Sequence, residues 1–269
     1  MIDPAPAPSG KWSDLRTRIL SAIVMVAVGA VEIWLGGLAF AVLVVVLTGV
    51  MIWELAMMTA PPERRSALVA AGVAGGALVA ALVLKTDLAA LFLAVPSVLL
   101  LLTPRHDQRL AGAYALAIML AGYGLVELRQ AGGTQVILWL VAVVVASDVL
   151  GYFAGRMLGG PKFWPAISPK KTWSGTVAGW IGAALVGLVV VLATGASWAL
   201  VPLSALVAFA GQMGDIAESW IKRRAGVKDA SNLIPGHGGV LDRFDALIGA
   251  VVVVLALGLV TPVAGLFGG

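Results

Sequence analysis

The sequence predicts an all-α polytopic integral membrane protein with about nine transmembrane helices, a cytoplasmic N-terminus and a C-terminus outside. Three observations support this fold class. Of the 269 residues, 60% are hydrophobic and 12% are charged, about half the charged share of a soluble protein. Apolar runs of about 20 residues, the length that a helix needs to cross a bilayer, recur along the chain. Most basic residues fall between alternate runs.

The nine apolar runs are expected to be helices, because unpaired backbone groups are too costly in lipid. The first follows basic residues and could imitate a secretory signal, but it is long, lacks a clear cleavage site and precedes equally apolar runs. The absence of cysteine excludes a disulfide framework. The runs cover residues 18–35, 38–58, 66–84, 87–103, 109–128, 134–156, 174–194, 198–221 and 240–264.

The basic residues predict the orientation of these runs. All of the 18 Lys and Arg residues except Lys85 and Arg129 lie on one side, in or beside five segments. An excess of Lys and Arg marks cytoplasmic segments. The predicted cytoplasmic segments are 1–17, 59–65, 104–108, 157–173 and 222–239.

The chain divides into three parts by composition. Residues 1–17 are expected to be a disordered cytoplasmic segment, and residues 18–130 are apolar scaffold helices. Residues 131–269 carry the polar and charged side chains in and beside helices, together with the two longest loops, 157–173 and 222–239. We therefore expect the chemistry in this last part, on the cytoplasmic side.

Acidic residues occur within the predicted spans of that part. A carboxylate at membrane depth is costly and is usually paired and functional. The alternative is a structural ion pair with Arg156, Arg223 or Arg243. Three different helices present such groups near the same membrane face, which favours a shared site: Asp148, Asp215, Glu218, Asp242 and Asp245.

Asp242 and Asp245 are spaced i, i+3, so they share one face of a helix. Acids in a first turn also stabilise the helix dipole, which is the alternative interpretation. Mg²⁺ prefers oxygen ligands and commonly joins one or two carboxylates to substrate phosphates. With Asp215 from the preceding helix, the pair forms a candidate metal site, and Glu218 either supports that site or pairs with Lys222.

The two long cytoplasmic loops have the composition of phosphate-binding segments. In one, Lys222, Arg223, Arg224 and Lys228 precede a glycine-rich turn around His237 that leads into a helix. A basic loop beside a membrane can also contact anionic lipid. The other loop places Lys170 and Lys171 just before a helix, where a topology-determining cluster with Trp173 as interfacial anchor is the alternative.

At this point the residues resemble a known family. The stretch 219–245, SWIKRRAGVKDASNLIPGHGGVLDRFD, resembles the signature of the phosphatidate cytidylyltransferase (CDP-diglyceride synthase) family at about a dozen positions. The stretches 147–156 and 168–173 are also similar to the family. Ser174 departs from it, since the family often places an acidic or amide residue there. Residues 1–130 contribute only hydropathy and length.

The resemblance implies an enzyme, a nucleotidyltransferase of phospholipid biosynthesis in the bacterial inner membrane. It would convert CTP and phosphatidate to CDP-diacylglycerol and diphosphate, with the lipid phosphate attacking the α-phosphorus in line. It implies Mg²⁺, with a second, monovalent ion such as K⁺ as an option. CTP, phosphatidate and membrane lipid would be its partners, a homodimer is compatible with it, and no nucleic acid is expected.

The resemblance also implies roles for single residues. Asp215, Asp242 and Asp245 would hold the metal. Phosphate contacts are expected from Lys222, Arg223, Lys228 and His237, with Arg243 either joining them or pairing an Asp. Lys170 and Lys171 would hold the triphosphate or the lipid phosphate. Asp148 would contact a metal or the cytidine. The remaining substrate contacts would be Ser168, Thr172, Asp229, Gly238 and Gly239.

Other functions remain as alternatives. A secondary transporter also uses intramembrane acids, but it tends to show internal repeats and broken midplane helices, which are not visible here. A CTP-dependent lipid kinase and a cytidylyltransferase for another lipid phosphate stay open. The motif of CDP-alcohol phosphotransferases, D-x-x-D-G-x-x-A-R, is absent. A purely structural protein would not gather so many acids beside a glycine-rich turn.

Overall fold

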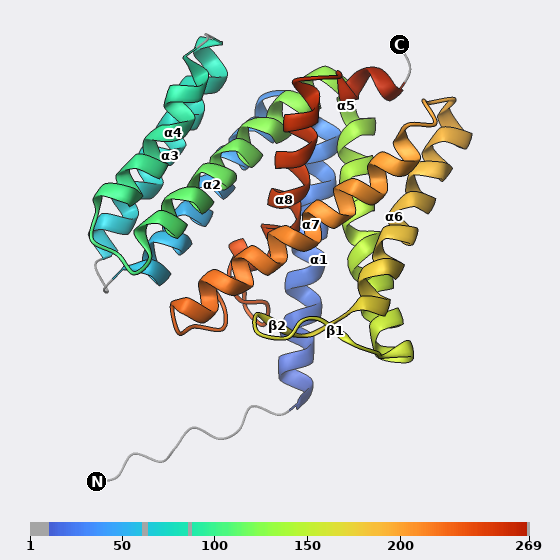
Figure 1. The fold of residues 1–269 in the computed structure, drawn as a ribbon. Coiled ribbons are helices and arrows are strands. Elements are labelled where there is room, and N and C mark those ends of the chain that lie inside the picture. The colour runs from blue at the N-terminus through green and yellow to red at the C-terminus, as the bar shows by residue number, and fades with distance from the viewer. Residues whose placement is uncertain (1–10, 61–63, 86–87, 268–269) are drawn as a thin grey trace.

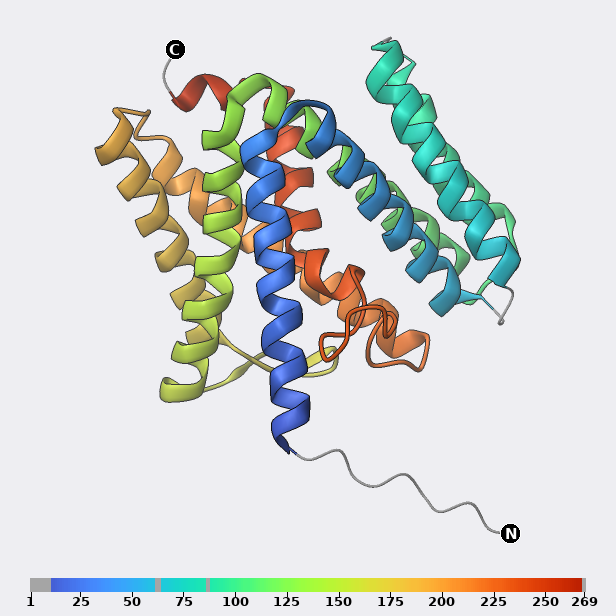
Figure 2. The same ribbon diagram turned by 180° about the vertical axis from the view of Figure 1, so that it is seen from behind.

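The fold is a bundle of helices with one small hairpin at one end (Figures 1 and 2). The computed structural model describes residues 11–60, 64–85 and 88–267. In chain order the elements are α1 (Lys11–Leu35), α2 (Gly37–Thr59), α3 (Arg64–Leu84), α4 (Ala89–Leu102), α5 (Gln108–Leu158), β1 (Lys162–Trp164), β2 (Ser168–Thr172), α6 (Trp173–Thr194), α7 (Leu200–Arg224), α8 (Leu241–Gly258) and the 3₁₀ helix η1 (Val263–Phe267).

Each of the nine predicted runs overlaps a helix, and residue 87 of the fourth run lies outside the described ranges. Two of them share α5, a 51-residue helix that is interrupted at Gly133, where φ is 64°. Among the described residues, six helices (α1, α2, α3, α5, α6 and α7) are long and apolar enough to cross a membrane. The chain is therefore a multi-pass membrane protein. Nine crossings stay a prediction, since α4 has only 14 residues and the 18-residue α8 carries Asp242, Arg243 and Asp245.

The structure departs from the predicted boundaries at four places. The ninth run, 240–264, extends beyond α8, which ends at Gly258. Loop 157–173 contains the antiparallel hairpin β1–β2, which an all-α prediction misses. Residues 11–17, expected to lack structure, are the first turns of α1, and residues 1–10 lie outside the described ranges. Residues 222–224, expected in a loop, are the last turn of α7.

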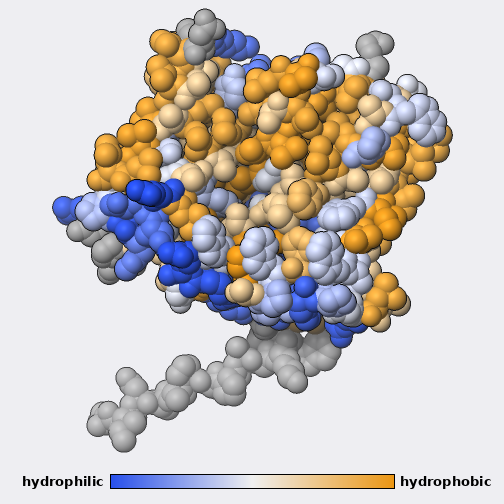
Figure 3. All heavy atoms as spheres, in the orientation of Figure 1, coloured by the Kyte–Doolittle hydropathy of each residue, from blue (hydrophilic) through white to orange (hydrophobic). Residues whose placement is uncertain are grey.

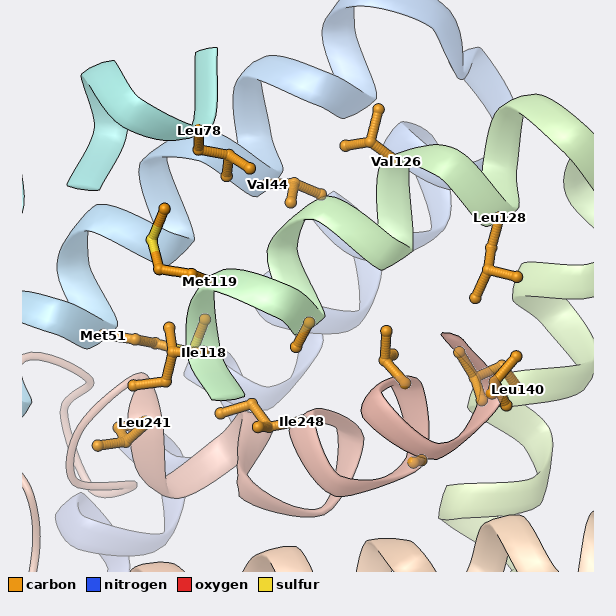
Figure 4. Packing of buried hydrophobic residues seen from close by; sticks show 14 of the residues in the cluster. Val44, Met51, Leu78, Ile118, Met119, Val126, Leu128, Leu140, Leu241 and Ile248 are labelled. Atoms are coloured by element: carbon orange, nitrogen blue, oxygen red, sulfur yellow. The ribbon is translucent and has the colours of Figure 1, made fainter. Parts of the chain in front are cut away.

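The apolar core lies where α2, α3, α5 and α8 meet. Figure 4 shows Met51 of α2, Ile118 and Met119 of α5, and Leu241 and Ile248 of α8 in one packed cluster. Many large apolar side chains instead lie on the outside of the helices. In Figure 3 they cover the upper part of the visible face, while hydrophilic residues gather along its lower edge. We call that edge, to which the hairpin belongs, the hairpin end.

Candidate active site

A cavity of about 640 Å³ lies at the hairpin end, between the hairpin and helices α5, α6, α7 and α8. Among the described residues its lining contains four carboxylates and four cations. The carboxylates are Asp148, Asp215, Asp242 and Asp245, and the cations are Arg156, Lys162, Lys170 and Lys171. A cavity with both carboxylates and cationic side chains suits a polyanionic ligand that carries a bound metal cation. The cationic side chains contact the polyanion, and the carboxylates contact the metal.

Half of the predicted site residues line this cavity: Asp148, Ser168, Lys170, Lys171, Thr172, Asp215, Asp242 and Asp245. The other half lie outside its lining: Lys222, Arg223, Lys228, Asp229, His237, Gly238, Gly239 and Arg243. Arg223, Lys228, Asp229 and Arg243 are exposed. The remaining four bond or pack around Asp242 or against α1, as described below.

Small residues let α5 and α6 approach closely enough to form one wall of the cavity. A Cβ on Gly175 of α6 would lie 2.5 Å from the carbonyl oxygen of Gly151 on α5, and one on Gly155 would lie 2.8 Å from Thr172 Oγ1. Gly151 and Gly155 are spaced i, i+4, as are Gly175 and Gly179, a pattern typical of close helix contacts in membranes. Only glycine fits at these contacts.

Glycines also join α7 to α8 beside the carboxylates. A Cβ on Gly214 would collide with the carbonyl oxygen of Asp245, and one on Gly249 would collide with that of Ala210. Gly214 precedes Asp215 directly. The close approach of these two helices therefore brings the Asp215 and Asp245 segments together from different parts of the chain.

The start of α6 is fixed by hydroxyl groups. Thr172 is the N-cap: its Oγ1 accepts a hydrogen bond from Gly175 N (3.2 Å) and lies 3.0 Å from Ser174 Oγ. Ser174 Oγ in turn donates to the carbonyl oxygen of Gly159 (2.5 Å). Ser174, whose type departs from the family pattern, thus ties the end of α5 to the start of α6.

Lys171 faces the acidic side of the cavity. Its Nζ donates to Asp215 Oδ2 (2.5 Å) and to the carbonyl oxygen of Gln212 (3.2 Å). Ser219 Oγ donates to the other oxygen of Asp215 (3.3 Å). The Asp215 side chain remains 35% exposed, so the carboxylate is held in place yet accessible from the cavity.

Lys222, predicted to contact phosphate, is bound by carboxylates. Its Nζ lies 2.5 Å from Glu218 Oε2 and donates to Asp242 Oδ1 (2.6 Å). The Glu218 side chain is fully buried and that of Asp242 is 3% exposed. A buried charge needs such pairing, because an unpaired ion is costly away from water. Lys222 thus links α7 to the start of α8.

The glycine-rich turn surrounds Asp242, and the phosphate contact predicted for the turn stays a prediction. Asp242 Oδ2 accepts hydrogen bonds from the backbone N–H groups of Gly239 (2.7 Å) and Ala230 (2.9 Å). Gly238 has φ of 85°, and a Cβ there would lie 2.9 Å from the same oxygen. In this arrangement the turn uses its donors to hold a carboxylate of the protein.

Glu54 of α2 is a site residue that the sequence reasoning missed. It is fully buried, and its carboxylate accepts hydrogen bonds from Leu241 N (2.6 Å), Val240 N (2.9 Å) and Ser231 Oγ (2.5 Å). Val240 and Leu241 form the N-terminus of α8, which attracts negative charge. An acid within an apolar run was the available signal, but the run belonged to a part of the chain assigned to scaffold.

Gln212 was also missed. Its Nε2 donates to Ser147 Oγ of α5 and to the carbonyl oxygen of Thr176 on α6, both at 3.2 Å. Its Oε1 accepts a hydrogen bond from Trp180 Nε1 (2.9 Å). One buried amide on α7 thereby joins three helices at the cavity wall, one turn before Asp215.

His237 contacts α1. Its Nδ1 lies 2.8 Å from Ser21 Oγ, which also donates to the carbonyl oxygen of Pro235 (3.0 Å). A Cβ on Gly236 would lie 2.6 Å from the Arg18 side chain. The loop between α7 and α8 is therefore packed against the first helix, and the phosphate contact predicted for His237 stays a prediction.

A surface ion pair fixes the end of α7. Arg224 donates from Nε and Nη2 to the two oxygens of Asp107, both at 2.6 Å. These hydrogen bonds lower the pKa of the Asp107 carboxyl from its ordinary value. The pair lies outside the cavity lining, so substitutions of Asp107 or Arg224 can serve as controls for substitutions inside the cavity.

The carboxylates of the cavity have the right chemistry for Mg²⁺, which takes oxygen ligands. Asp215 and Asp242 each already bind an ammonium group. Within the described ranges, no three His, Asp or Glu side chains converge as a ready-made ion site. The donor set fits a metal that is shared with substrate phosphates better than one that the protein encloses alone.

Comparisons with known proteins agree with the sequence pattern. A model of the cytidylyltransferase family matches residues 16–261. A protein of Brucella abortus named phosphatidate cytidylyltransferase is 36% identical over 257 residues, 91% of this chain and 94% of its own length. Proteins of the same name match shorter stretches: one of Staphylococcus saprophyticus is 39% identical over 138 residues (49% of this chain, 53% of its own), and one of Helicobacter pylori is 42% identical over 118 (43% and 44%). The chain belongs to the cytidylyltransferase family and is a nucleotidyltransferase enzyme.

Proposed function

We propose that this enzyme is a phosphatidate cytidylyltransferase, which makes CDP-diacylglycerol and diphosphate from CTP and phosphatidate. The name shared by relatives from several bacteria supports this substrate pair. The observation that carries the proposal is the cavity itself. It combines carboxylates and cations at the polar edge of an apolar bundle, where a lipid headgroup and a soluble nucleotide can meet.

In this reaction an oxygen of the lipid phosphate forms a bond to the α-phosphorus of CTP. The bond from that phosphorus to the bridging oxygen breaks, and diphosphate leaves with the electron pair. A phosphate monoester is largely ionised near pH 7 because its second pKa is about 6, so no strong general base is required. The cations of the cavity bring the two anions together and stabilise the charge that develops on the leaving group.

Asp215, Asp242 and Asp245 would hold Mg²⁺, which supplies charge neutralisation to the phosphates when it is bound. Lys171 and Lys222 keep two of these carboxylates oriented. Glu54 and the glycine-rich turn fix the start of α8, so that Asp242 keeps its position. A monovalent ion such as K⁺ stays a prediction, and activity measured against KCl at constant ionic strength would test it.

We infer nine membrane crossings, with the hairpin end in the cytoplasm of a bacterial inner membrane. The 51-residue α5 is long enough for two crossings, with its turn at Gly133. The hairpin and the end of α7 carry a large share of the Lys and Arg residues, as cytoplasmic segments do. The homodimer also stays a prediction, and light scattering of the detergent-purified protein would test it.

An assay of the purified protein tests the function. Diphosphate release is expected only with CTP, phosphatidate and Mg²⁺ together, and it should stop with EDTA. Asp215→Asn should lower the rate by about a hundredfold or more, the size of effect of removing an important electrostatic group. Asp107→Asn, outside the cavity, serves as the matched control and should keep full activity. Release without phosphatidate would contradict the proposal.

A further inference from the structure

Two anionic substrates must share the cavity if the proposed function holds, so its cations must divide between them. Lys171 is already paired with Asp215. No ion pair joins Arg156, Lys162 or Lys170 to a carboxylate within the part of the chain that the structure describes. These three cations are therefore available for phosphate groups, and the positions of Arg156 and Lys162 indicate which substrate they meet.

Arg156 lies where the cavity meets the outer surface of α5. It is exposed and also lines the cavity. On the same side of the helix, at spacings of three to four residues, Val149 is 47% exposed, Tyr152 58% and Phe153 55%. Met157, next to Arg156, is 80% exposed. Apolar and aromatic side chains exposed on a membrane helix face lipid, so Arg156 borders both the lipid and the cavity.

The guanidinium of Arg156 is oriented back along α5. Its Nη1 donates to the Tyr152 hydroxyl oxygen at 2.8 Å, one helical turn nearer to Asp148. Because that oxygen accepts the bond, the hydroxyl proton of Tyr152 is free to be donated to an anion. Among the described residues the other four N–H groups of the guanidinium have no acceptor, and they form a planar fork that matches the oxygens of a phosphate.

We propose that Arg156 and Tyr152 form the binding site for the phosphate of the lipid substrate, with Lys162 of the hairpin adding positive charge. The lipid reaches this site from the membrane along the exposed face of α5, with its phosphate in the cavity and its acyl chains beside Tyr152 and Phe153. The nucleotide, which arrives from water, occupies the part of the cavity near Lys171 and Asp215. This assignment rests on the proposed function and adds which cation serves which substrate.

Substrate-resolved kinetics in mixed micelles test the assignment. Arg156→Gln should raise the KM for phosphatidate, in mole fraction, by about tenfold or more, because it removes charge-assisted hydrogen bonds. The KM for CTP should stay within about twofold. Arg156→Lys should fall between the wild type and Arg156→Gln, since it restores the charge but not the fork. Tyr152→Phe should raise the KM for phosphatidate by less than Arg156→Gln does. The control is Arg109→Gln, at an exposed position on the first turn of α5, and it should change neither KM.

Binding without turnover separates this proposal from the proposed function. Short-chain phosphatidate should bind to the wild type in the absence of CTP, measured by calorimetry, and about tenfold or more weakly to Arg156→Gln. If the KM for CTP rises instead of, or together with, that for phosphatidate, the assignment is wrong. Unchanged constants in Arg156→Gln and Tyr152→Phe would also overturn it. A wild type that needs no phosphatidate for turnover would instead contradict the proposed function.

Discussion

At the scale of single residues, the site depends on a lysine that two carboxylates share. Lys222 is 12% exposed and lies within 2.6 Å of oxygens from Glu218 and Asp242. Removing one partner of a buried ion pair leaves the other charge uncompensated, and this typically costs about 3–5 kcal/mol. The ammonium group therefore matters first for folding and for the position of Asp242.

Lys222→Met should lower the free energy of unfolding by about 3–5 kcal/mol, because two buried carboxylates lose their cation. Thermal unfolding in detergent would show this as a large fall in the melting temperature. The double variant Lys222→Met with Glu218→Met, which also removes one of the stranded charges, should recover part of the loss. Arg224→Gln breaks an exposed pair and should change the melting temperature little. If Lys222→Met melts like the wild type, the shared-cation account is wrong.

The sequence predicts the carboxylates of the site better than the groups that hold them. Five acids stood out because acids at membrane depth are rare. Asp148, Asp215, Asp242 and Asp245 line the cavity, whereas Glu218 is buried against Lys222. The carboxylate that binds both Lys222 and the glycine-rich turn lies on another element, α8. Spacing along the sequence does not show which segments meet in the fold, and it suggested phosphate contacts for these groups. In the structure they bond to Asp242, and the phosphate contacts stay a prediction.

At the scale of elements, the start of α8 is held by a helix that lies nearly 190 residues earlier in the chain. Glu54 of α2 accepts the backbone N–H groups of Val240 and Leu241. A helix N-terminus leaves such groups without partners inside the helix, so an acceptor from elsewhere stabilises it. The orientation of Asp242, in the first turn of α8, depends on this contact.

Glu54→Gln should lower kcat while leaving the KM values within about threefold, since losing a hydrogen-bonded carboxylate costs about 1–3 kcal/mol of local stability. The substitution keeps the size of the side chain but leaves one oxygen to serve three donors. Steady-state kinetics of the purified variant measure the effect. Glu127→Gln, on α5 six residues before the kink at Gly133 and outside the cavity lining, is the matched control. A normal kcat in Glu54→Gln would show that α8 keeps its position without this contact.

The contact of α5 with α6 gives a second prediction for elements. Gly175→Ala should lower the free energy of unfolding by about 1–3 kcal/mol, because the added Cβ would meet the backbone oxygen of Gly151, which can move only with its helix. Gly76→Ala has nothing within 4 Å of the new Cβ and should be neutral or slightly stabilising. Melting temperatures of the two variants decide the matter. Equal values would mean that the helices are less closely packed than described.

At the scale of the whole molecule, apolar side chains cover the outside of the helices and hydrophilic residues gather at the hairpin end (Figure 3). This distribution determines how the chain lies in the membrane. Hydropathy predicted where helices occur, because a lipid-exposed segment must satisfy its backbone groups internally. It could not predict the hairpin β1–β2, whose strands have three and five residues and pair only with each other. It did separate the two halves of α5, because the predicted runs 109–128 and 134–156 lie on either side of the kink at Gly133.

The orientation can be measured directly, because the chain contains no cysteine. Ala166→Cys, between β1 and β2, should react with a membrane-impermeant maleimide only from the cytoplasmic side. Ser197→Cys, between α6 and α7, should react only from the outside. Both positions are exposed, and a detergent-lysed sample controls for reactivity. Labelling of both cysteines from the same side would contradict the proposed crossing of α6.

The central claim is that this chain transfers a cytidylyl group from CTP to the phosphate of a lipid. The most direct test supplies CTP labelled with ³²P at either the α or the γ position, together with phosphatidate and Mg²⁺, and separates lipid from water-soluble products. We predict that the α label appears in the lipid and the γ label in diphosphate. Transfer of the γ label to the lipid would identify a CTP-dependent kinase instead, and retention of both labels in water-soluble products would contradict the account.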